Sequence, residues 1–502
     1  MTAWKSALLK PAAWWTARSV AADAARAVES QKRTLEKLLR RGRLTAFGRE
    51  HGFDKVGDGR AFARAVPMRD YEEYRPWIDR IRAGEADVTW PGRPLYYALT
   101  SGTTSATKQV PLTREIMPAQ YGTTRKAMLN YYGRTGKGGW LDGTAVVLVG
   151  SPALKTVDGV PSGLLSGIIN HHVPAWFRSM TLPSKPVMAM TSWQDKMAAL
   201  VEESRGRDVR LLGGSPAWML MYFEYLLERT GRASVKEVFP NLSVYVHGGV
   251  DYGIYRAAIE SKVGGAIDTI DVYSATESFV AFQAGEPGEG MLLNLSSGFY
   301  FEFVAVENAD DPHAERLTLD QVEVDRDYVI VISTCSGFWG YVMGDTVRFT
   351  SVSPPQIIVT GRTKNIIAVA NERLYAKEVD DAMIAACAAT GTRVSEFTVA
   401  PQAVPEGGGR PFHEWFVEFD GPEPQDRDRF VAAIDAHISG VNYNYGAFRR
   451  SGVLAPPRLH LVRPGGFRDY MKSIDRMGGQ FKLPRLQTSR SIVDALPPFL
   501  LP

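Results

Sequence analysis

Between residues 144 and 274 the chain alternates short runs of β-branched and apolar residues with helical segments. The runs read TAVVLVG, VRLL, LSVYVHGGV and AIDTIDVYS, at residues 144–150, 209–212, 242–250 and 266–274. A strand that leads into a helix is normally followed by a strand that runs in the same direction. The sequence therefore predicts a mainly parallel α/β sheet at the centre of the chain.

The sequence pattern changes after Met291, where expected strands such as MLLNLSSGFYFEFVAV and DYVIVISTC follow one another with few helical stretches. This pattern predicts a β-rich subdomain at about 291–360, inside a large N-terminal domain of mixed α/β sheets at 1–361. Helices and strands alternate again in 362–502, which we expect to form a small, mobile α+β C-terminal domain. The strand–turn–strand segment at 361–366 is the expected hinge. With 502 residues, the chain is several times the commonest domain size, which agrees with this division.

One helix is expected from Ala21 to Phe47. Leu35, Leu38 and Leu39 recur there at helical spacing, and Gly48 follows as a stop signal. The other face is basic and is expected to be solvated; it carries Lys32, Arg33, Lys37, Arg40, Arg41 and Arg43.

Charge and cysteine usage exclude several classes of protein. Against 58 Lys and Arg stand 55 Asp and Glu, and a net charge of +3 gives no field of the kind that binds nucleic acid. The two cysteines, Cys335 and Cys387, form no CxxC pair, so neither a zinc site nor a disulfide scaffold is expected. Reduced thiols favour the cytoplasm.

No run of about 18 apolar residues is present, so no membrane span is expected. The N-terminal stretch MTAWKSALLKPAAWW is interrupted by charges and a proline, so no signal peptide is expected there. Trp4, Trp14 and Trp15 are expected to pack against the body of the protein rather than to lie on a membrane surface.

The segment LTSGTTSATKQVP, at 99–111, has the composition of a phosphate-binding loop. Small residues let backbone N–H groups approach an anion, hydroxyls donate further hydrogen bonds, and Lys108 adds a positive charge. The Walker pattern GxxxxGK[ST] is not met, because Thr107 and Gln109 stand where it requires glycine and a hydroxyl residue.

Two later segments place carboxylates beside aromatic and hydroxyl residues. DVYSATESF, at 271–279, carries Glu277 just past an expected strand, which is where α/β folds bind ligands. In GYVMGDTVRF, at 340–349, Gly344 is expected to make a turn that presents Asp345 as a bidentate acceptor.

The loop TSGTTSATK resembles the phosphate loop of AMP-forming, firefly-luciferase-like adenylating enzymes, usually written [ST]SGTTGxPK. The resemblance implies that Ser101, Gly102, Thr103 and Thr104 bind the nucleotide and that Lys108 is catalytic. Two positions depart from the pattern: Ser105 stands where glycine is usual, and Thr107 where proline is usual.

The order of the later segments also resembles that superfamily. By this resemblance Tyr273 lies against the adenine, Thr276 lies near the α-phosphate, and Glu277 is catalytic and binds magnesium. Asp345 then binds the ribose hydroxyls, and Arg362 is the nucleotide-binding arginine of the GRxK hinge.

Three further segments narrow the resemblance to the auxin-responsive Gretchen Hagen family of acyl acid amido synthetases. They are PMRDYEEYRPWIDRIRAGE at 67–85, YFEFV at 300–304, and RPGGFRDYM…GGQFKLPRL at 463–486. The last contains a version of the family's QYK-x-PR tail, made of Gln480, Phe481, Lys482, Pro484 and Arg485. The family also implies that Gly248 and Gly249 contact the adenine through their backbone. The chain departs from the family at Gly340 and Val342, where arginines are common.

The resemblance implies an ATP-dependent carbon–nitrogen ligase with ATP and Mg2+ as cofactors. Such an enzyme converts a carboxylic acid to an acyl adenylate plus pyrophosphate and passes the acyl group to an amine, most plausibly an amino acid. The C-terminal domain would swing to bring the catalytic Lys482 in for one half-reaction. Candidate acyl-site residues from family position are Tyr121, Thr124, Met128 and Leu164, and core packing explains them equally well.

Two alternatives stay open. Coenzyme A ligases share the first half-reaction, although the QFKLPR tail favours amide formation. A non-catalytic ATP- or AMP-binding protein could also keep the fold.

Overall fold

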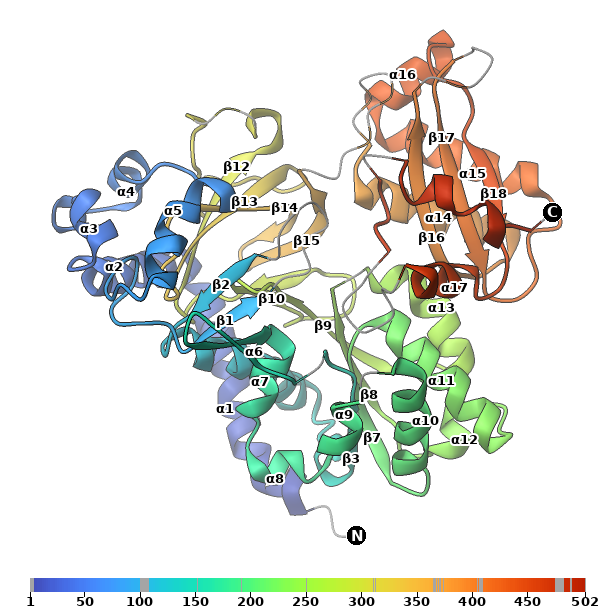
Figure 1. Ribbon diagram of the computed structural model, residues 1–502, viewed down its shortest axis with the longest axis horizontal. Coiled ribbons are helices and arrows are strands. Elements are labelled where there is room, and N and C mark those ends of the chain that lie inside the picture. Colours follow the sequence, from blue (N-terminus) through green and yellow to red (C-terminus); the bar gives the residue numbers. More distant parts are fainter. Residues whose placement is uncertain are drawn as a thin grey trace. The chain divides into compact units, whose positions relative to one another are not determined.

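The computed structural model describes the chain except residues 1–3, 100–107, 151, 191, 250, 310, 312, 364–366, 368, 370, 371, 373, 404, 406–409, 475–482, 488, 489 and 502. The chain divides into two compact units (Figure 1). Unit 1 comprises Met1–Ser215, Lys236–Gly249 and Ile267–Ile358, and unit 2 comprises Pro216–Val235, Val250–Ala266 and Val359–Pro502. Helices α11 (Pro216–Thr230) and α13 (Tyr252–Val263) thus belong to the unit that holds the C-terminal sheet. The domain boundary at 361 stays a prediction.

The expected parallel sheet is confirmed at the centre of unit 1. It is built from β3 (Thr144–Val147), β6 (Thr181–Leu182), β7 (Val209–Gly213), β8 (Val244–Gly248) and β9 (Asp268–Ser274). Each of these pairs in parallel with its neighbour, in the order β9-β8-β7-β3-β6. The apolar side chains of β7 and β8 are buried, whereas β6 and most of β9 are half-buried.

The strands expected after Met291 are present and join this same sheet. After β9 the order continues through β10 (Phe279–Phe282), β11 (Met291–Leu293), β15 (Pro355–Arg362), β14 (Tyr341–Val352), β13 (Asp327–Thr334) and β12 (Phe299–Ala305). These pairs are antiparallel where their register is resolved. A separate four-stranded sheet, in the order β2-β1-β5-β4, contains β1 (Tyr96–Leu99), β2 (Gln109–Leu112), β4 (Lys155–Val157) and β5 (Val160–Leu164).

The single helix expected at 21–47 is wrong in its extent. The structure has α1 (Trp4–Ala25), α2 (Ala27–Gly42) and α3 (Ala46–Glu50), and Thr45 caps α3 by accepting a hydrogen bond from the backbone of Gly48. Gly48 therefore lies inside helix α3 and does not end a helix. It permits close packing, because an added Cβ would lie 2.2 Å from the carbonyl oxygen of Gly42. The leucine stripe of α2 is buried and its basic face is exposed, as predicted.

The expectation that the N-terminal tryptophans pack against the body is also wrong. Trp4, Trp14 and Trp15 are 59%, 55% and 67% exposed. Helix α1 packs on α6 (Ile116–Thr135) through its opposite face, where Ala13 is fully buried. A Cβ on Gly133 of α6 would lie 2.2 Å from the Ala13 carbonyl oxygen, so the two helices meet backbone to backbone.

The remaining helices of unit 1 are short. They are α4 (Gly59–Ala65), α5 (Tyr71–Arg82), α7 (Leu165–His171), α8 (Ala175–Arg178), α9 (Lys185–Met188) and α10 (Trp193–Ser204), with 3-10 turns η1 (Phe53–Lys55), η2 (Gly139–Asp142) and η3 (Val306–Asn308). The helix α12 (Val235–Val238) lies at the junction of the two units in the sequence. Among the described residues no helix is both long and apolar enough to cross a membrane.

The α+β fold expected at the C-terminus is confirmed in unit 2. Its sheet has the order β16-β17-β18, with β16 (Val394–Gln402) antiparallel and β18 (Arg458–Val462) parallel to β17 (Phe412–Phe419). The helices are α14 (Ala376–Thr390), α15 (Arg427–Val441), α16 (Tyr443–Ser451) and α17 (Gly466–Ser473), followed by η4 (Val493–Ala495) and η5 (Pro497–Phe499). Gly391, with φ +67°, ends α14.

Candidate active site

The YSATE segment forms the tight connection between β9 and β10. Tyr273 lies at the end of β9, while Thr276 and Glu277 lie in the turn, which closes through a 2.8 Å hydrogen bond from the amide of Ala275 to the carbonyl of Ser278. The predicted position just past a strand is therefore correct. Thr276 and Glu277 therefore lie in the turn of a β-hairpin and not in a loop that leads from a strand into a helix.

Strand β14 runs along this hairpin and contacts it three times. Tyr341 donates a 3.2 Å hydrogen bond to Glu277 Oε1, and the hydroxyl of Tyr273 donates a 2.5 Å hydrogen bond to Asp345 Oδ2. Between them, Ser278 Oγ lies 3.7 Å from Met343 Sδ. The strands β15, β11 and β10 separate β14 from β9 in the sheet order, so the sheet curls to bring these side chains together.

The turn expected at Gly344 is absent, because this residue lies inside β14. Its φ of +82° is one that glycine adopts at little cost, and it makes the strand irregular beside Asp345. Asp345 itself is buried, with 6% of its surface exposed.

Lys108 lies directly before β2 and stacks on an aromatic ring. Its Nζ is 5.1 Å from the ring centroid of Tyr71, and the Tyr71 hydroxyl accepts a 2.8 Å hydrogen bond from the backbone of Gln109. The predicted phosphate-loop residues Ser101, Gly102, Thr103 and Thr104 lie outside the described residues, as do Ser105 and Thr107.

Charges converge on Glu277. Burial raises the pKa of Glu277, and the negative charge of Asp345 raises this pKa further. Lys108 and the hydrogen bond from Tyr341 act in the opposite direction. Two carboxylates and one ammonium group therefore interact in one partly buried place, which suits a ligand that carries both cations and phosphates.

The HGG segment at the end of β8 requires both of its glycines. A Cβ on Gly248 would lie 2.1 Å from the carbonyl oxygen of Val272, and Gly249 has φ +83°. Gly248 pairs with Val272, the residue before Tyr273, so this backbone lies next to the predicted adenine position. Behind it, His247 is buried with its Nδ1 3.4 Å from Asp271.

Two buried polar residues of α6 hold the hairpin, and sequence reasoning missed them. The side-chain amide of Gln120 donates to the carbonyl oxygens of Ala275 and Thr276, at 3.3 and 3.2 Å. One turn later Thr123 accepts a 3.0 Å hydrogen bond from Asn294. The available signal was a pair of polar residues at i, i+3 on a face that is otherwise apolar, a pattern that is easily taken for a solvated surface.

Of the candidate acyl-site residues, Tyr121, Thr124 and Leu164 are half-buried, whereas Met128 is buried. Tyr121 stacks on His172 with ring centroids 6.0 Å apart, and His172 Nε2 lies 3.2 Å from the hydroxyl of Tyr96. Leu164 ends β5, directly before α7, and pairs with Leu99; Thr124 is half-buried one turn along α6 from Tyr121. Met128 is buried in the main hydrophobic core. Burial lowers the pKa of His172, which keeps this aromatic group uncharged.

The position of the missing arginine at 340 leaves no room for a side chain. Gly340 has φ +59°, and an added Cβ would lie 2.9 Å from Arg316 Nη1 and from the carbonyl oxygen of Pro67. Arg316 is itself buried, with its Nε 3.3 Å from Glu302 Oε1. At the second position, the amide of Val342 donates to the carbonyl of Arg69.

The predicted site residues beyond β15 belong to unit 2. Arg362 is exposed at the end of β15. Arg485, of the QFKLPR tail, is ion-paired with Glu396, hydrogen-bonds the Tyr255 hydroxyl and stacks 4.3 Å from the centroid of Phe397. Lys482 lies outside the described residues, as do Gln480 and Phe481.

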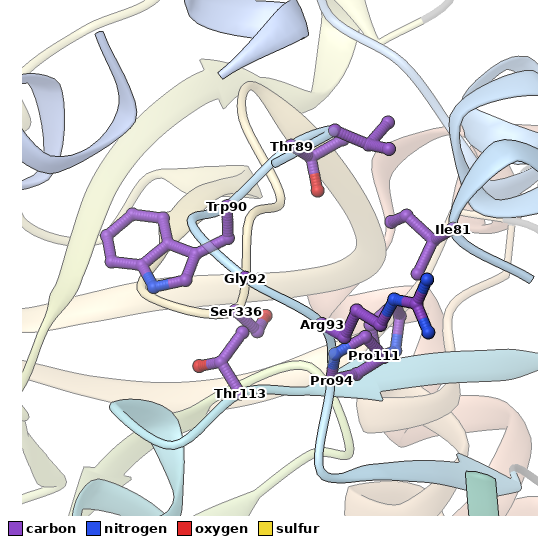
Figure 2. A pocket seen from close by; sticks show the side chains of 10 residues that line it. Ile81, Thr89, Trp90, Gly92, Arg93, Pro94, Pro111, Thr113 and Ser336 are labelled. Atoms are coloured by element: carbon purple, nitrogen blue, oxygen red, sulfur yellow. The ribbon is translucent and has the colours of Figure 1, made fainter. Parts of the chain in front are cut away.

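A small pocket near residues 88–94 is lined by none of the candidate site residues Lys108, Tyr273, Glu277 and Asp345 (Figure 2). Trp90, Thr113 and Ser336 line one side of it, and Arg93, Pro94 and Pro111 line the other. Neither a carboxylate nor a histidine lines it, so it offers no acid–base chemistry.

Three domains of one protein family match three stretches of the chain. They are the GH3 family N-terminal domain at residues 17–162, its central domain at 292–362 and its C-terminal domain at 377–491. The chain is also similar to the indole-3-acetic acid-amido synthetase GH3.8 of Oryza sativa subsp. indica, with 24% identity over 93% of this chain and 89% of that protein. Indole-3-acetic acid-amido synthetase GH3.2 of Arabidopsis thaliana is 24% identical over 73% of this chain and 80% of its own length.

Solved structures share the fold. AtGH3.15 acyl acid amido synthetase in complex with 2,4-DB matches with a TM-score of 0.80 and 18% identity, over 97% of this chain and 96% of that one. A 2-hydroxyisobutyryl-CoA ligase in the postadenylation state matches less closely, with a TM-score of 0.58 and 13% identity over 98% and 91% of the two chains. The predicted adenylate-forming architecture is therefore confirmed. Together with the three matched domains, which span more than half of its length, this shows that the chain belongs to the GH3 family.

Proposed function

We propose that the protein is an ATP-dependent acyl acid amido synthetase, a carbon–nitrogen ligase that forms AMP. The observation that carries this proposal is the meeting of Tyr273, Glu277 and Asp345 beside Lys108. Membership of the GH3 family, whose similar members are named as indole-3-acetic acid-amido synthetases, supports the same reaction.

In the proposed first half-reaction a carboxylate oxygen of the acid attacks the α-phosphorus of ATP. The bond to the β-phosphate oxygen breaks, and pyrophosphate leaves with the electron pair. Asp345 accepts hydrogen bonds from the ribose hydroxyls, and Tyr273 holds its carboxylate in place. Lys108 stabilises the negative charge that builds up at phosphorus, so the protein acts by positioning and charge stabilisation.

The residues present fit a magnesium ion. Glu277 is a partly buried carboxylate close to a second one, and a divalent cation would offset the cost of ionising both. Among the described residues no three potential ligands converge. Mg2+ is commonly held by one or two carboxylates together with substrate phosphates and water. When bound, the ion would neutralise phosphate charge, and Glu277 would hold it.

In the proposed second half-reaction the nitrogen of an amine attacks the acyl carbon. An amide bond forms, the bond to the AMP oxygen breaks, and the nitrogen loses a proton to the solvent. An amino acid is the proposed acceptor, and Lys482 is the proposed catalytic residue of the mobile C-terminal part. The proposed acid is an aryl carboxylate, since Tyr96, Tyr121 and His172 offer an uncharged aromatic lining.

The proposed compartment is the cytoplasm. Cys335 and Cys387 are both free, and burial raises the pKa of each thiol, which keeps both in the unreactive protonated form. Free thiols of this kind are typical of reducing compartments.

The test is acid-dependent exchange of radioactive pyrophosphate into ATP over a panel of aryl, indolyl and fatty acids. Glu277→Gln is expected to lower the exchange at least a hundredfold. The matched control is Glu323→Ala, whose side chain is 70% exposed and far from the site in sequence, and it is expected to behave as wild type. The proposed adenylation is refuted if no acid supports exchange although ATP binds by calorimetry; that result identifies a nucleotide-binding protein.

The acceptor is tested by mass spectrometry of the product formed with each active acid. An amide with an amino acid is expected. A thioester with coenzyme A, in place of an amide, would reassign the protein to the thioligases.

A further inference from the structure

Helix α1 has no separate polar face, because its few charged residues are spread around it, yet only one side of it is covered. Ala13, Val20 and Ala24 face the protein and are buried. The opposite side exposes Trp4 and Leu8, at 59% and 68%, and Trp14 and Trp15, at 55% and 67%. A helix without a polar face is normally buried on all sides, so this exposed surface calls for a partner.

The exposed residues form one continuous surface. Positions 4, 8, 11 and 15 fall within a narrow arc of a helix with 3.6 residues per turn, and Trp14 lies at its edge. Helix α8 extends this surface, because Trp176 is 54% exposed and Lys5 Nζ lies 3.1 Å from Met180 Sδ, two residues past the end of α8. Figure 1 shows α8 beside the first turns of α1. We call Trp4, Leu8, Trp14, Trp15 and Trp176 the tryptophan face.

Most charges next to the tryptophan face are positive, although Asp23 lies in the last turn of α1 and Asp142 accepts hydrogen bonds from the amides of Lys5 and Ser6 in the first. Between Trp4 and Ala22 the charged residues are Lys5, Lys10 and Arg18, and the segment contains no aspartate or glutamate. Two of these cations lie against exposed indole rings: Arg18 Cζ is 4.7 Å from the centroid of Trp14, and Lys5 Nζ is 5.9 Å from that of Trp4. Two of the four indole rings thus have a cation beside them.

We propose that the tryptophan face docks the protein on an anionic lipid surface, with α1 lying in the plane of the headgroups. Indole rings favour the boundary between headgroups and acyl chains, and flanking lysines and arginines pair with lipid phosphates. Large aromatic side chains flanked by cations are the composition that such a surface binds. This inference does not depend on the reaction proposed above.

The apolar part of the proposal is tested by flotation with vesicles. Wild type is expected to float with vesicles of phosphatidylglycerol and phosphatidylcholine in equal parts. The double variant Trp4→Ser, Trp15→Ser removes two largely exposed rings and is expected to lower the bound fraction at least tenfold. The matched control, Val441→Ser with Val453→Ser, removes apolar groups that are 56% and 46% exposed in unit 2 and is expected to float like wild type.

The electrostatic part is tested by charge reversal. Lys10→Glu with Arg18→Glu is expected to abolish flotation, and the same change in net charge on α2, Lys37→Glu with Arg40→Glu, is expected to preserve it. The wild-type protein is not expected to float with vesicles of pure phosphatidylcholine.

Three results would overturn the proposal. They are a wild type that stays in the soluble fraction with anionic vesicles, a tryptophan variant that floats as well as wild type, and equal loss for both charge-reversed pairs. Sedimentation velocity supplies a fourth: a dimer of the wild type that the tryptophan variant converts to a monomer, without vesicle binding by either, would assign the face to self-association.

Discussion

The hydroxyl of Tyr273 donates a 2.5 Å hydrogen bond to Asp345 Oδ2 across a separation of 72 residues in the sequence. The two residues lie on β9 and β14, which are not neighbours in the sheet. This bond joins the parallel half of the sheet to its antiparallel half at the proposed nucleotide site. It also fixes the orientation of the buried carboxylate that we propose as the acceptor for the ribose hydroxyls.

Tyr273→Phe is therefore expected to raise the KM for ATP about tenfold while changing kcat little. A hydrogen bond to a charged group contributes about 1.5–3 kcal/mol, and 1.4 kcal/mol corresponds to a factor of ten. Steady-state kinetics of the exchange reaction measures both constants. Tyr328→Phe is the control, because its hydroxyl accepts a hydrogen bond from the backbone of Glu323, in a structural turn. An unchanged KM in Tyr273→Phe would show that this bond does not position the ribose acceptor.

Gln120→Leu is expected to slow the exchange about tenfold, since Gln120 donates to the carbonyls of Ala275 and Thr276, the two residues directly before Glu277. The variant loses hydrogen bonds of about 1 kcal/mol each to two partly buried carbonyls. Asn130→Leu is the matched control. It breaks the same kind of bond, from the same helix to the carbonyl of Ala284, beyond the hairpin. Equal loss of activity in both variants would reduce the role of Gln120 to general stability.

The sequence predicts which residues belong to the candidate site, but it does not predict which of them contact one another. Glu277 and Asp345 stand out because short motifs tie a carboxylate to a fixed spacing from aromatic and hydroxyl residues. Their interaction through Tyr273 and Tyr341 depends on the curl of a sheet whose intervening strands lie between them in the sheet order. Local patterns carry no information on that curl.

The errors of the sequence reading have one physical cause, which is that tertiary packing decides what a local signal means. Gly48 looks like a helix stop and instead lets α3 pack against Gly42. The tryptophans of α1 look like core residues, yet the side of the helix that packs on α6 is the one with alanines, because a backbone approach at Gly133 excludes large rings. The alternation of helices and strands in 362–502 is a local feature, and the α+β fold that it indicates is predicted correctly.

Gly248→Ala is expected to weaken ATP binding at least tenfold and to lower the melting temperature. The added methyl carbon would lie 2.1 Å from the Val272 carbonyl oxygen, so β8 and β9 have to move apart beside Tyr273. Calorimetry with ATP and thermal unfolding measure the two effects. Gly440→Ala in α15 is the control, since no atom lies within 4 Å of its added Cβ, and alanine is the better helix former there. Wild-type affinity in Gly248→Ala would remove the backbone of the HGG segment from the nucleotide site.

Tyr121→Ala and Met128→Ala separate the acyl site from the core. Tyr121 is half-buried and stacks on His172, so its removal is expected to raise the KM for the acid at least fivefold and leave the KM for ATP unchanged. Met128 is buried in the core, and its truncation is expected to cost about 2–5 kcal/mol of stability with little change in the KM for the acid. Kinetics with the best acid of the panel, together with chemical unfolding, distinguishes them. The reverse pattern would place Met128, and not Tyr121, in the acyl site.

Glu302 is expected to make the stability of the protein depend on pH. It lies in β12 with no exposed surface, and burial raises its pKa to about 7 although Arg316 opposes the shift. In the unfolded chain the same group titrates near its ordinary value of 4.5, so between these values the folded state binds more protons than the unfolded state. Stability from this group is thus fully present below about pH 4.5 and is lost as the pH rises towards about 7.

The size of this effect follows from the shift of the pKa, at 1.36 kcal/mol for each unit, and amounts to about 3 kcal/mol. The free energy of unfolding of wild type, compared with that of Glu302→Gln at pH 5, 6, 7 and 8, measures it. The glutamine has no proton to lose, so the variant gains relative to wild type as the pH rises, even though Arg316 keeps its charge in both. Glu323→Gln, exposed and on the surface, is expected to follow wild type at every pH. Parallel curves for wild type and Glu302→Gln would mean that Glu302 is ionised throughout, held by its pairing with Arg316.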